Sequence, residues 1–196
     1  MTVGILGGTF DPPHLGHVAL ARRAIEALGL ERLLVLVVGE APHKAVETDA
    51  ETRFRLAEAA FADIPGVELW RHELDRPGPS YTVDTARWAS ERFGDVLIVV
   101  GGDEFADFPE WKDPDVILEH ARVAVATRPG TEQNRIEAAK ARLARPDRIV
   151  EFELDPLPIA SRDVRDRLSR GERVDDLVPP AVAHLIDELG LYRGTL

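Results

Sequence analysis

Two histidines three positions apart end a short stretch that is rich in glycine and proline. The stretch reads GGTFDPPHLGH, covers residues 7–17 and directly follows the apolar run VGIL. Gly7 and Gly8 have no side chains, so their backbone amides can approach an anion closely. His14 and His17 fall where a helix is expected to begin, and residues three apart share one helix face. Because a helix N-terminus already favours phosphate, the two imidazoles would complete a phosphate-binding site.

Further polar or glycine-rich segments follow other apolar runs along the chain. They are GEAPHK (39–44), GGDEF (101–105), TRPG (127–130) and LPIASRDVR (157–165). In a parallel sheet the carboxyl ends of the strands meet at one edge, and ligands bind there. The segments are therefore expected to gather around one site with the histidine stretch.

The elements that must position these segments alternate between short apolar runs and longer helical patterns. Predicted strands cover residues 2–6, 32–38, 66–70, 95–102, 122–130 and 148–154. Predicted helices cover residues 17–29, 49–63, 81–94, 114–121, 131–145, 161–171 and 179–190. This alternation predicts an α/β fold with a Rossmann-like, doubly wound parallel sheet. At 196 residues, and with no composition break, the chain is expected to form a single domain over residues 1–196.

Composition excludes several classes of protein. The net charge of −11 disfavours a general nucleic-acid-binding protein, which would carry a basic face. The absence of cysteine excludes disulfides and thiolate metal sites. The longest apolar runs, LLVLVV and VLIVV, are far shorter than the ~20 residues of a membrane span. The first residues lack the basic region of a secretion signal, so a cytoplasmic location and no membrane association are expected.

The stretch GGTFDPPHLGH resembles the signature of the nucleotidyltransferase superfamily that carries an H-x-G-H motif. More narrowly, the chain resembles the family of bacterial nicotinate-nucleotide adenylyltransferases. The similarity extends to APHK (41–44), SYTVDT (80–85), GGDEFADFPEW (101–111), RPG (128–130) and LVPPAVAHLIDELGLY (177–192). This resemblance implies transfer of AMP from ATP to nicotinate mononucleotide, giving deamido-NAD and pyrophosphate in NAD biosynthesis. It also implies Mg²⁺ held by phosphate oxygens and water, with no dedicated protein metal site.

The resemblance assigns roles to residues of three groups. His14 and His17 would be catalytic, with His17 holding the α-phosphate as charge develops. The remaining ATP-binding residues would be Gly7, Gly8, Thr9, Phe10, Gly101, Asp103, Arg128, Ser161 and Arg165. The mononucleotide-binding residues would be Lys44, Tyr81, Thr82, Asp103 and Trp111. A tryptophan offers a flat face for a pyridine ring, and an aspartate at a strand end can accept hydrogen bonds from ribose hydroxyls.

One segment departs from the family pattern. The family reads I-S-S-T-x-I-R where this chain reads IASRDVR, so Ala160 and Arg162 stand in place of two hydroxyl residues. Other interpretations remain open at this stage. The acceptor could be nicotinamide mononucleotide or phosphopantetheine, or the chain could be a non-catalytic nucleotide-binding regulator. Asp103 could instead cap a helix, and so could Ser80 or Thr82. Trp111 could instead be a residue of the hydrophobic core. Homo-oligomer formation is also left open.

Overall fold

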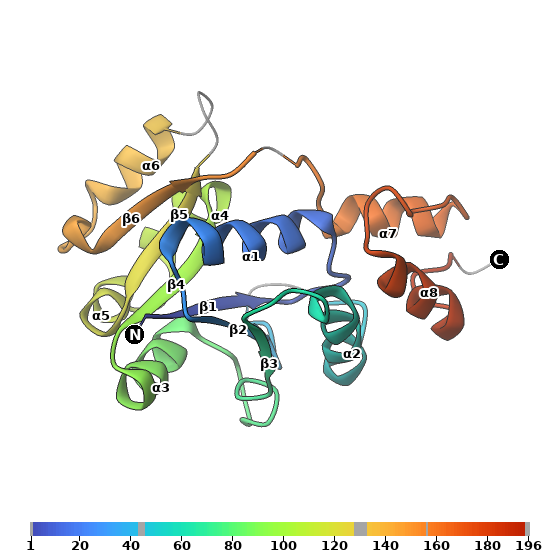
Figure 1. Ribbon diagram of the computed structural model, residues 1–196, viewed down its shortest axis with the longest axis horizontal. Coiled ribbons are helices and arrows are strands. Elements are labelled where there is room, and N and C mark those ends of the chain that lie inside the picture. Colours follow the sequence, from blue (N-terminus) through green and yellow to red (C-terminus); the bar gives the residue numbers. More distant parts are fainter. Residues whose placement is uncertain (1, 43–45, 128–132, 156, 195–196) are drawn as a thin grey trace.

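The computed structural model describes residues 2–42, 46–127, 133–155 and 157–194. Within them six strands form one sheet in which every neighbouring pair is parallel. The strands are β1 (Val3–Gly8), β2 (Arg32–Val37), β3 (Val67–Trp70), β4 (Val96–Gly101), β5 (Arg122–Thr127) and β6 (Ile149–Glu153). Their order is β3-β2-β1-β4-β5-β6, so strand order reverses between β1 and β4. The predicted Rossmann-like, doubly wound sheet is confirmed (Figure 1).

Helices connect the strands and close the described chain. They are α1 (Leu15–Leu28), α2 (Ala50–Phe61), α3 (Thr82–Phe93), α4 (Gly102–Ala106), α5 (Pro114–His120), α6 (Gln133–Lys140), α7 (Ser161–Ser169) and α8 (Pro180–Leu189). There are also two short 3₁₀ helices. The first, η1 (Phe108–Glu110), lies between α4 and α5, and the second, η2 (Pro146–Arg148), lies between α6 and β6. The described helices show no segment long and apolar enough to cross a membrane.

Two sequence predictions about helices are corrected. The helix predicted over 131–145 ends at Lys140, where tighter turns link Arg142 N–H to Ala139 O and Leu143 N–H to Lys140 O. These turns bury Leu143. The short helix α4 was not predicted, because five residues are too few to show a helical period.

Each face of the sheet carries its own hydrophobic core. Side chains alternate along β2, with Leu33, Val35 and Val37 in one cluster and Leu34 and Leu36 in the other. The first cluster packs beneath α1, α2, α7 and α8, and the second beneath α3, α4, α5 and α6. Figure 1 shows α1 on one side of the sheet and α3 and α5 on the other. This double coverage explains why the central strands β2 and β4 are almost continuously apolar.

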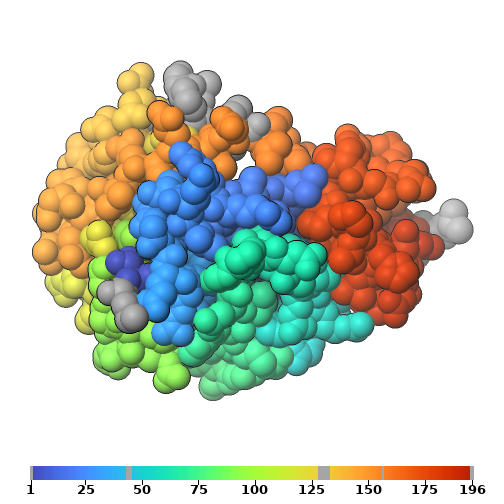
Figure 2. All heavy atoms as spheres, in the orientation of Figure 1, coloured from blue at the N-terminus to red at the C-terminus, as the bar shows by residue number. Residues whose placement is uncertain are grey.

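The C-terminal helices form one end of the molecule. In Figure 2 the orange and red residues of this region abut the blue N-terminal helix and the teal α2. Val164 of α7 and Val182 and Ile186 of α8 are buried in the same cluster as Leu20 of α1 and Phe54 of α2. Helices α7 and α8 are therefore packed close to α1, which follows β1.

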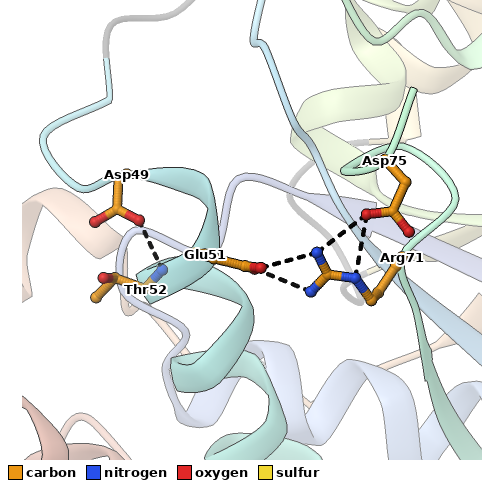
Figure 3. A network of polar contacts seen from close by, with 5 residues as sticks. All are labelled: Asp49, Glu51, Thr52, Arg71 and Asp75. Atoms are coloured by element: carbon orange, nitrogen blue, oxygen red, sulfur yellow. Dashed lines mark hydrogen bonds and ion pairs between the residues drawn. The ribbon is translucent and has the colours of Figure 1, made fainter. Parts of the chain in front are cut away.

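The segment after β3 is tied to the start of α2 by a polar network (Figure 3). Arg71 donates two hydrogen bonds to Glu51, at 2.9 and 2.8 Å, and also contacts Asp75 at 3.0 Å. These hydrogen bonds lower the pKa of Glu51. Asp49 caps α2 by accepting a hydrogen bond of 3.0 Å from Thr52 N–H. The network fixes a loop whose next residues lead into the site.

Candidate active site

The strands β1 and β4 separate at their carboxyl ends. Their pairing stops at Ile5 and Ile98, although β1 continues to Gly8 and β4 to Gly101. A cavity of about 300 Å³ lies there, bordered by residues of both strands. This is the point where strand order reverses, which is where open parallel sheets bind their ligands.

Six of the predicted site residues line the cavity. They are Gly7, Gly8, Thr9, Tyr81, Thr82 and Trp111. They come from three separate segments, namely the end of β1, the start of α3 and the residue after η1. The structure therefore brings together residues that are more than a hundred positions apart in the sequence. Their predicted roles toward ligands stay predictions.

Gly7 and Gly8 lack a side chain for two different structural reasons. A Cβ added to Gly7 would meet no atom within 4 Å, so the Gly7 backbone borders open space. A Cβ added to Gly8 would lie 2.9 Å from Cζ of Phe10, whose ring is buried. Phe10 has a positive φ of 49°, which turns its ring inward beneath the loop. Predicted as an ATP-site residue, Phe10 supports the loop from inside.

The two histidines lie together at the start of α1. His14 is its N-cap residue, and the His14 and His17 rings stack with centroids 3.7 Å apart. Nδ1 of His17 accepts a hydrogen bond of 3.1 Å from the His14 backbone N–H. Neutral His17 then carries its proton on Nε2, which makes that nitrogen a donor. A Cβ at Gly16 would lie 3.0 Å from His14 Nδ1, so the glycine of the motif leaves room for this ring.

The histidines are not among the residues that line the cavity, but they belong to the same loop. The Phe10 ring packs edge-on against His17 with centroids 5.1 Å apart. Residues 7–9 border the cavity and residues 10–17 continue directly into the histidine pair. The stacked rings therefore hold one end of a loop whose other end forms the cavity wall.

The residues predicted after β4 have mixed positions. Gly101 is the N-cap residue of α4, so Asp103, the second residue of that helix, is not a helix cap. Asp103 is exposed and forms an ion pair of 3.4 Å with Arg135. Neither Gly101 nor Asp103 is among the residues that line the cavity. The predicted site residues Lys44 and Arg128 lie outside the described part of the chain.

The residues predicted on α7 contact the loop after β1. Ser161 Oγ donates a hydrogen bond of 2.9 Å to the carbonyl oxygen of Pro12. Arg165 donates to the carbonyl oxygen of Asp11 at 2.6 Å and to Glu47 Oε1 at 2.7 Å. The start of α7 is therefore joined by hydrogen bonds to the loop that follows β1.

Sequence reasoning missed a buried arginine that organises the loop. Arg53 is 1% exposed, and its guanidinium donates to four backbone carbonyl oxygens at 2.8–3.0 Å. The acceptors are Thr9, Val38, Gly39 and Thr48. Burial lowers the pKa of Arg53. The available signal was its spacing, because Arg53 falls on the same helix face as the buried residues of α2.

A second missed anchor joins the C-terminal region to the loop. The Asp11 carboxylate is 3% exposed and accepts hydrogen bonds of 2.7 Å from Glu47 N–H and from the Tyr192 hydroxyl. Burial raises the pKa of Tyr192, and its hydrogen bond to Asp11 adds to this. Only the position of Tyr192 in the family-like closing segment hinted at a role.

The cavity also has an unexpected buried acid. Glu73 is 5% exposed and accepts a hydrogen bond of 2.6 Å from the Thr85 hydroxyl. Burial raises the pKa of Glu73, although this hydrogen bond opposes the shift.

Ser80 Oγ accepts a hydrogen bond of 3.3 Å from Gly39 N–H. Since the N-cap residue of α3 is Tyr81, neither Ser80 nor Thr82 caps that helix.

The sequence profile of the cytidylyltransferase-like family matches residues 5–167. The chain belongs to this family. Within it, a probable nicotinate-nucleotide adenylyltransferase of Roseiflexus sp. (strain RS-1) is 40% identical, covering 97% of this chain and 98% of that protein. A probable nicotinate-nucleotide adenylyltransferase of Thermus thermophilus is 38% identical, covering 98% of this chain and 100% of that protein. The chain is thus a member of the nicotinate-nucleotide adenylyltransferase group, as its motifs indicated.

A solved structure supports the fold of this adenylyltransferase family. Plasmodium falciparum nicotinic acid mononucleotide adenylyltransferase, complexed with NaAD, superposes with a TM-score of 0.77 and covers 97% of each chain. Its sequence is only 14% identical, so the likeness concerns the fold. Among the described residues of this family member, no three His, Asp or Glu side chains are grouped to hold a metal ion.

Proposed function

We propose that this chain transfers AMP from ATP to nicotinate mononucleotide, releasing pyrophosphate and forming deamido-NAD. The observation that carries this proposal is the separation of β1 and β4. It brings the glycine loop, the start of α3 and Trp111 to one cavity. A glycine backbone that borders open space suits a polyphosphate, and an aromatic face suits a pyridine ring. Residues 1–196 would act as one nucleotidyltransferase domain.

In the proposed reaction a phosphate oxygen of the mononucleotide attacks the α-phosphorus of ATP. The new P–O bond forms as the bond between the α-phosphorus and the bridging oxygen breaks, and pyrophosphate leaves with the electron pair. Phosphate monoesters have a second pKa of about 6, so this nucleophile needs no general base at neutral pH. The protein must therefore align two anions and stabilise the developing charge.

The histidine pair would supply that stabilisation. Its geometry supports a donor role, because the backbone N–H of His14 fixes the Nδ1 side of His17 and leaves Nε2–H as the donor. His14 would contact the triphosphate beside it. Gly7, Gly8 and Thr9 would offer backbone amides to the adenylate.

The remaining predicted residues would complete the two binding regions. Phe10, Ser161 and Arg165 would position the phosphate-binding loop, and the two α7 residues would also face the triphosphate. Gly101 and Asp103 would meet the ribose, while Tyr81, Thr82 and Trp111 would meet the pyridine ring. The roles predicted for Lys44 and Arg128 belong to the same proposal.

Magnesium fits this site as a phosphate-bound ion. The described residues offer no cluster of carboxylates for it, so phosphate oxygens and water would supply its ligands. When bound, it would neutralise charge on the leaving pyrophosphate.

A pyrophosphate-release assay tests the proposal. The purified chain, ATP and Mg²⁺ are combined separately with nicotinate mononucleotide, nicotinamide mononucleotide and phosphopantetheine. We expect the fastest release with nicotinate mononucleotide. His17→Ala should lower kcat by about 10²-fold or more, as for the loss of a transition-state hydrogen-bond donor. His184→Ala removes an exposed histidine of α8 and serves as the matched control.

Each alternative has its own outcome in this assay. Preference for phosphopantetheine would assign a different acceptor class. Nucleotide binding without release from any acceptor would favour a non-catalytic regulator. Equal rates for the His17→Ala and His184→Ala variants would remove His17 from the mechanism.

A further inference from the structure

Acidic residues outnumber basic residues in the described lining of the cavity. Glu73, Glu104 and Glu110 contribute carboxyl groups, whereas Lys112 is the one lysine or arginine among the described residues that line it. An unscreened acidic lining would repel a substrate that carries a further carboxylate on its ring. The position of the single cation therefore bears on which ring substituent this cavity accepts.

The ammonium of Lys112 is held over an aromatic ring of the same cavity. Its Nζ lies 4.0 Å from the centroid of the Tyr81 ring, within the distance of a cation–π interaction. Tyr81 directly precedes α3, and Trp111 directly precedes Lys112. The cation thus lies where the proposed ring-binding residues converge.

The backbone on both sides of Lys112 is fixed. Trp111 packs against the buried Phe108 with ring centroids 5.2 Å apart. Asp113 adopts a left-handed conformation, with φ 51° and ψ 56°, and is the N-cap residue of α5. Aspartate tolerates this conformation better than most residues. The sharp turn at Asp113 sets the direction in which the chain carries Lys112.

Two of the three acids that line the cavity have other partners. Glu110 forms an ion pair of 2.5 Å with Arg142, and Glu73 accepts the Thr85 hydroxyl at 2.6 Å. Within the described ranges, the ammonium of Lys112 contacts the Tyr81 ring, whereas the carboxylate of Glu110 is paired with Arg142. The charge of Lys112 is therefore available to a ligand in the cavity.

We infer that the Lys112 side chain is a specificity-determining residue that favours a pyridine ring carrying a carboxylate over one carrying a carboxamide. This inference rests on the proposed function. A carboxylate gains charge attraction from the ammonium, whereas the neutral amide gains only a hydrogen bond. The cation–π contact keeps the ammonium near the ring site before the substrate arrives, which reduces the entropy lost on binding.

Steady-state kinetics on both mononucleotides test the inference. Lys112→Met removes the charge and keeps an unbranched side chain of nearly the same length, whereas Lys112→Arg keeps the charge. Arg173→Met removes a charge whose side chain is 88% exposed and which does not line the cavity, and it is the matched control. The quantity compared is the ratio of kcat/KM for nicotinate mononucleotide to that for nicotinamide mononucleotide.

We expect Lys112→Met to lower this ratio about 10- to 100-fold, allowing for partial solvent screening of an exposed lysine. The loss should come from a higher KM for the acid, with kcat for the acid and the constants for the amide little changed. Lys112→Arg should stay within about threefold of the wild-type ratio, and Arg173→Met should match it. Equal losses on both substrates in Lys112→Met would overturn the inference and indicate a packing role. A wild-type chain inactive on both substrates would instead refute the proposed function itself.

Discussion

Removal of the Tyr192 hydroxyl tests whether the C-terminal region anchors the loop after β1. Tyr192→Phe deletes one oxygen and keeps the ring. The hydroxyl donates a hydrogen bond of 2.7 Å to Asp11, whose carboxylate is 3% exposed. A hydrogen bond to a charged group contributes about 1.5–3 kcal/mol to stability. Asp11 keeps its second hydrogen bond, from Glu47 N–H, so we expect a loss of about 1.5–2 kcal/mol.

Thermal and urea unfolding measure this loss. For a chain of this size, each kcal/mol shifts Tm by about 2–4 °C, so Tyr192→Phe should lower Tm by roughly 3–8 °C. The three tryptophans report urea unfolding by fluorescence. The urea m-value should not change, since the variant exposes the same surface on unfolding.

A double-mutant cycle with Asp11→Asn isolates the bond from its surroundings. If Tyr192 and Asp11 stabilise the loop together, their coupling energy should be about 1 kcal/mol or more. A coupling energy near zero, or a loss below about 0.5 kcal/mol in Tyr192→Phe, would refute the anchoring role.

Two further predictions concern the cavity. Trp111→Ala should weaken nicotinate mononucleotide binding about 10- to 100-fold, as for loss of one aromatic stacking partner, with a smaller effect on ATP in calorimetric titrations. Equal losses for both ligands would assign Trp111 to packing. Burial raises the folded-state pKa of Glu73, so its ionisation is penalised in the folded state and the wild type should lose stability relative to Glu73→Gln as pH rises above about 4.5. Urea unfolding at several pH values measures the difference, and a constant difference would contradict the assigned cause.

Local sequence patterns predicted most of the fold because each element depends on nearby residues. Continuous apolar runs indicated the buried central strands, and all six predicted strands were found. The glycines that follow the helix patterns, such as Gly29 and Gly190, are left-handed C-caps in the structure. Helix α6 was predicted too long because the tighter turns after Lys140, which bury Leu143, are not visible in the local sequence pattern.

The site was only partly predictable because its supports are long-range. An arginine within a helix usually faces solvent, yet the acceptors of Arg53 include Thr9, 44 positions earlier. Asp11 and Tyr192 are 181 positions apart, and no local pattern pairs them. Lys112 carried no motif of its own, and only the folded chain places it over Tyr81.

The separation of β1 and β4 means that the hollow is made by main chain rather than by missing side-chain volume. Beyond Ile5 and Ile98 the two strands no longer exchange ladder hydrogen bonds, so the gap persists whatever side chains border it. A substitution at Lys112, which lies outside both strands, is then expected to change the lining of the cavity without disturbing the sheet. Substitutions intended to change the acceptor should therefore be made at residues that border the cavity, leaving the paired parts of β1 and β4 unchanged.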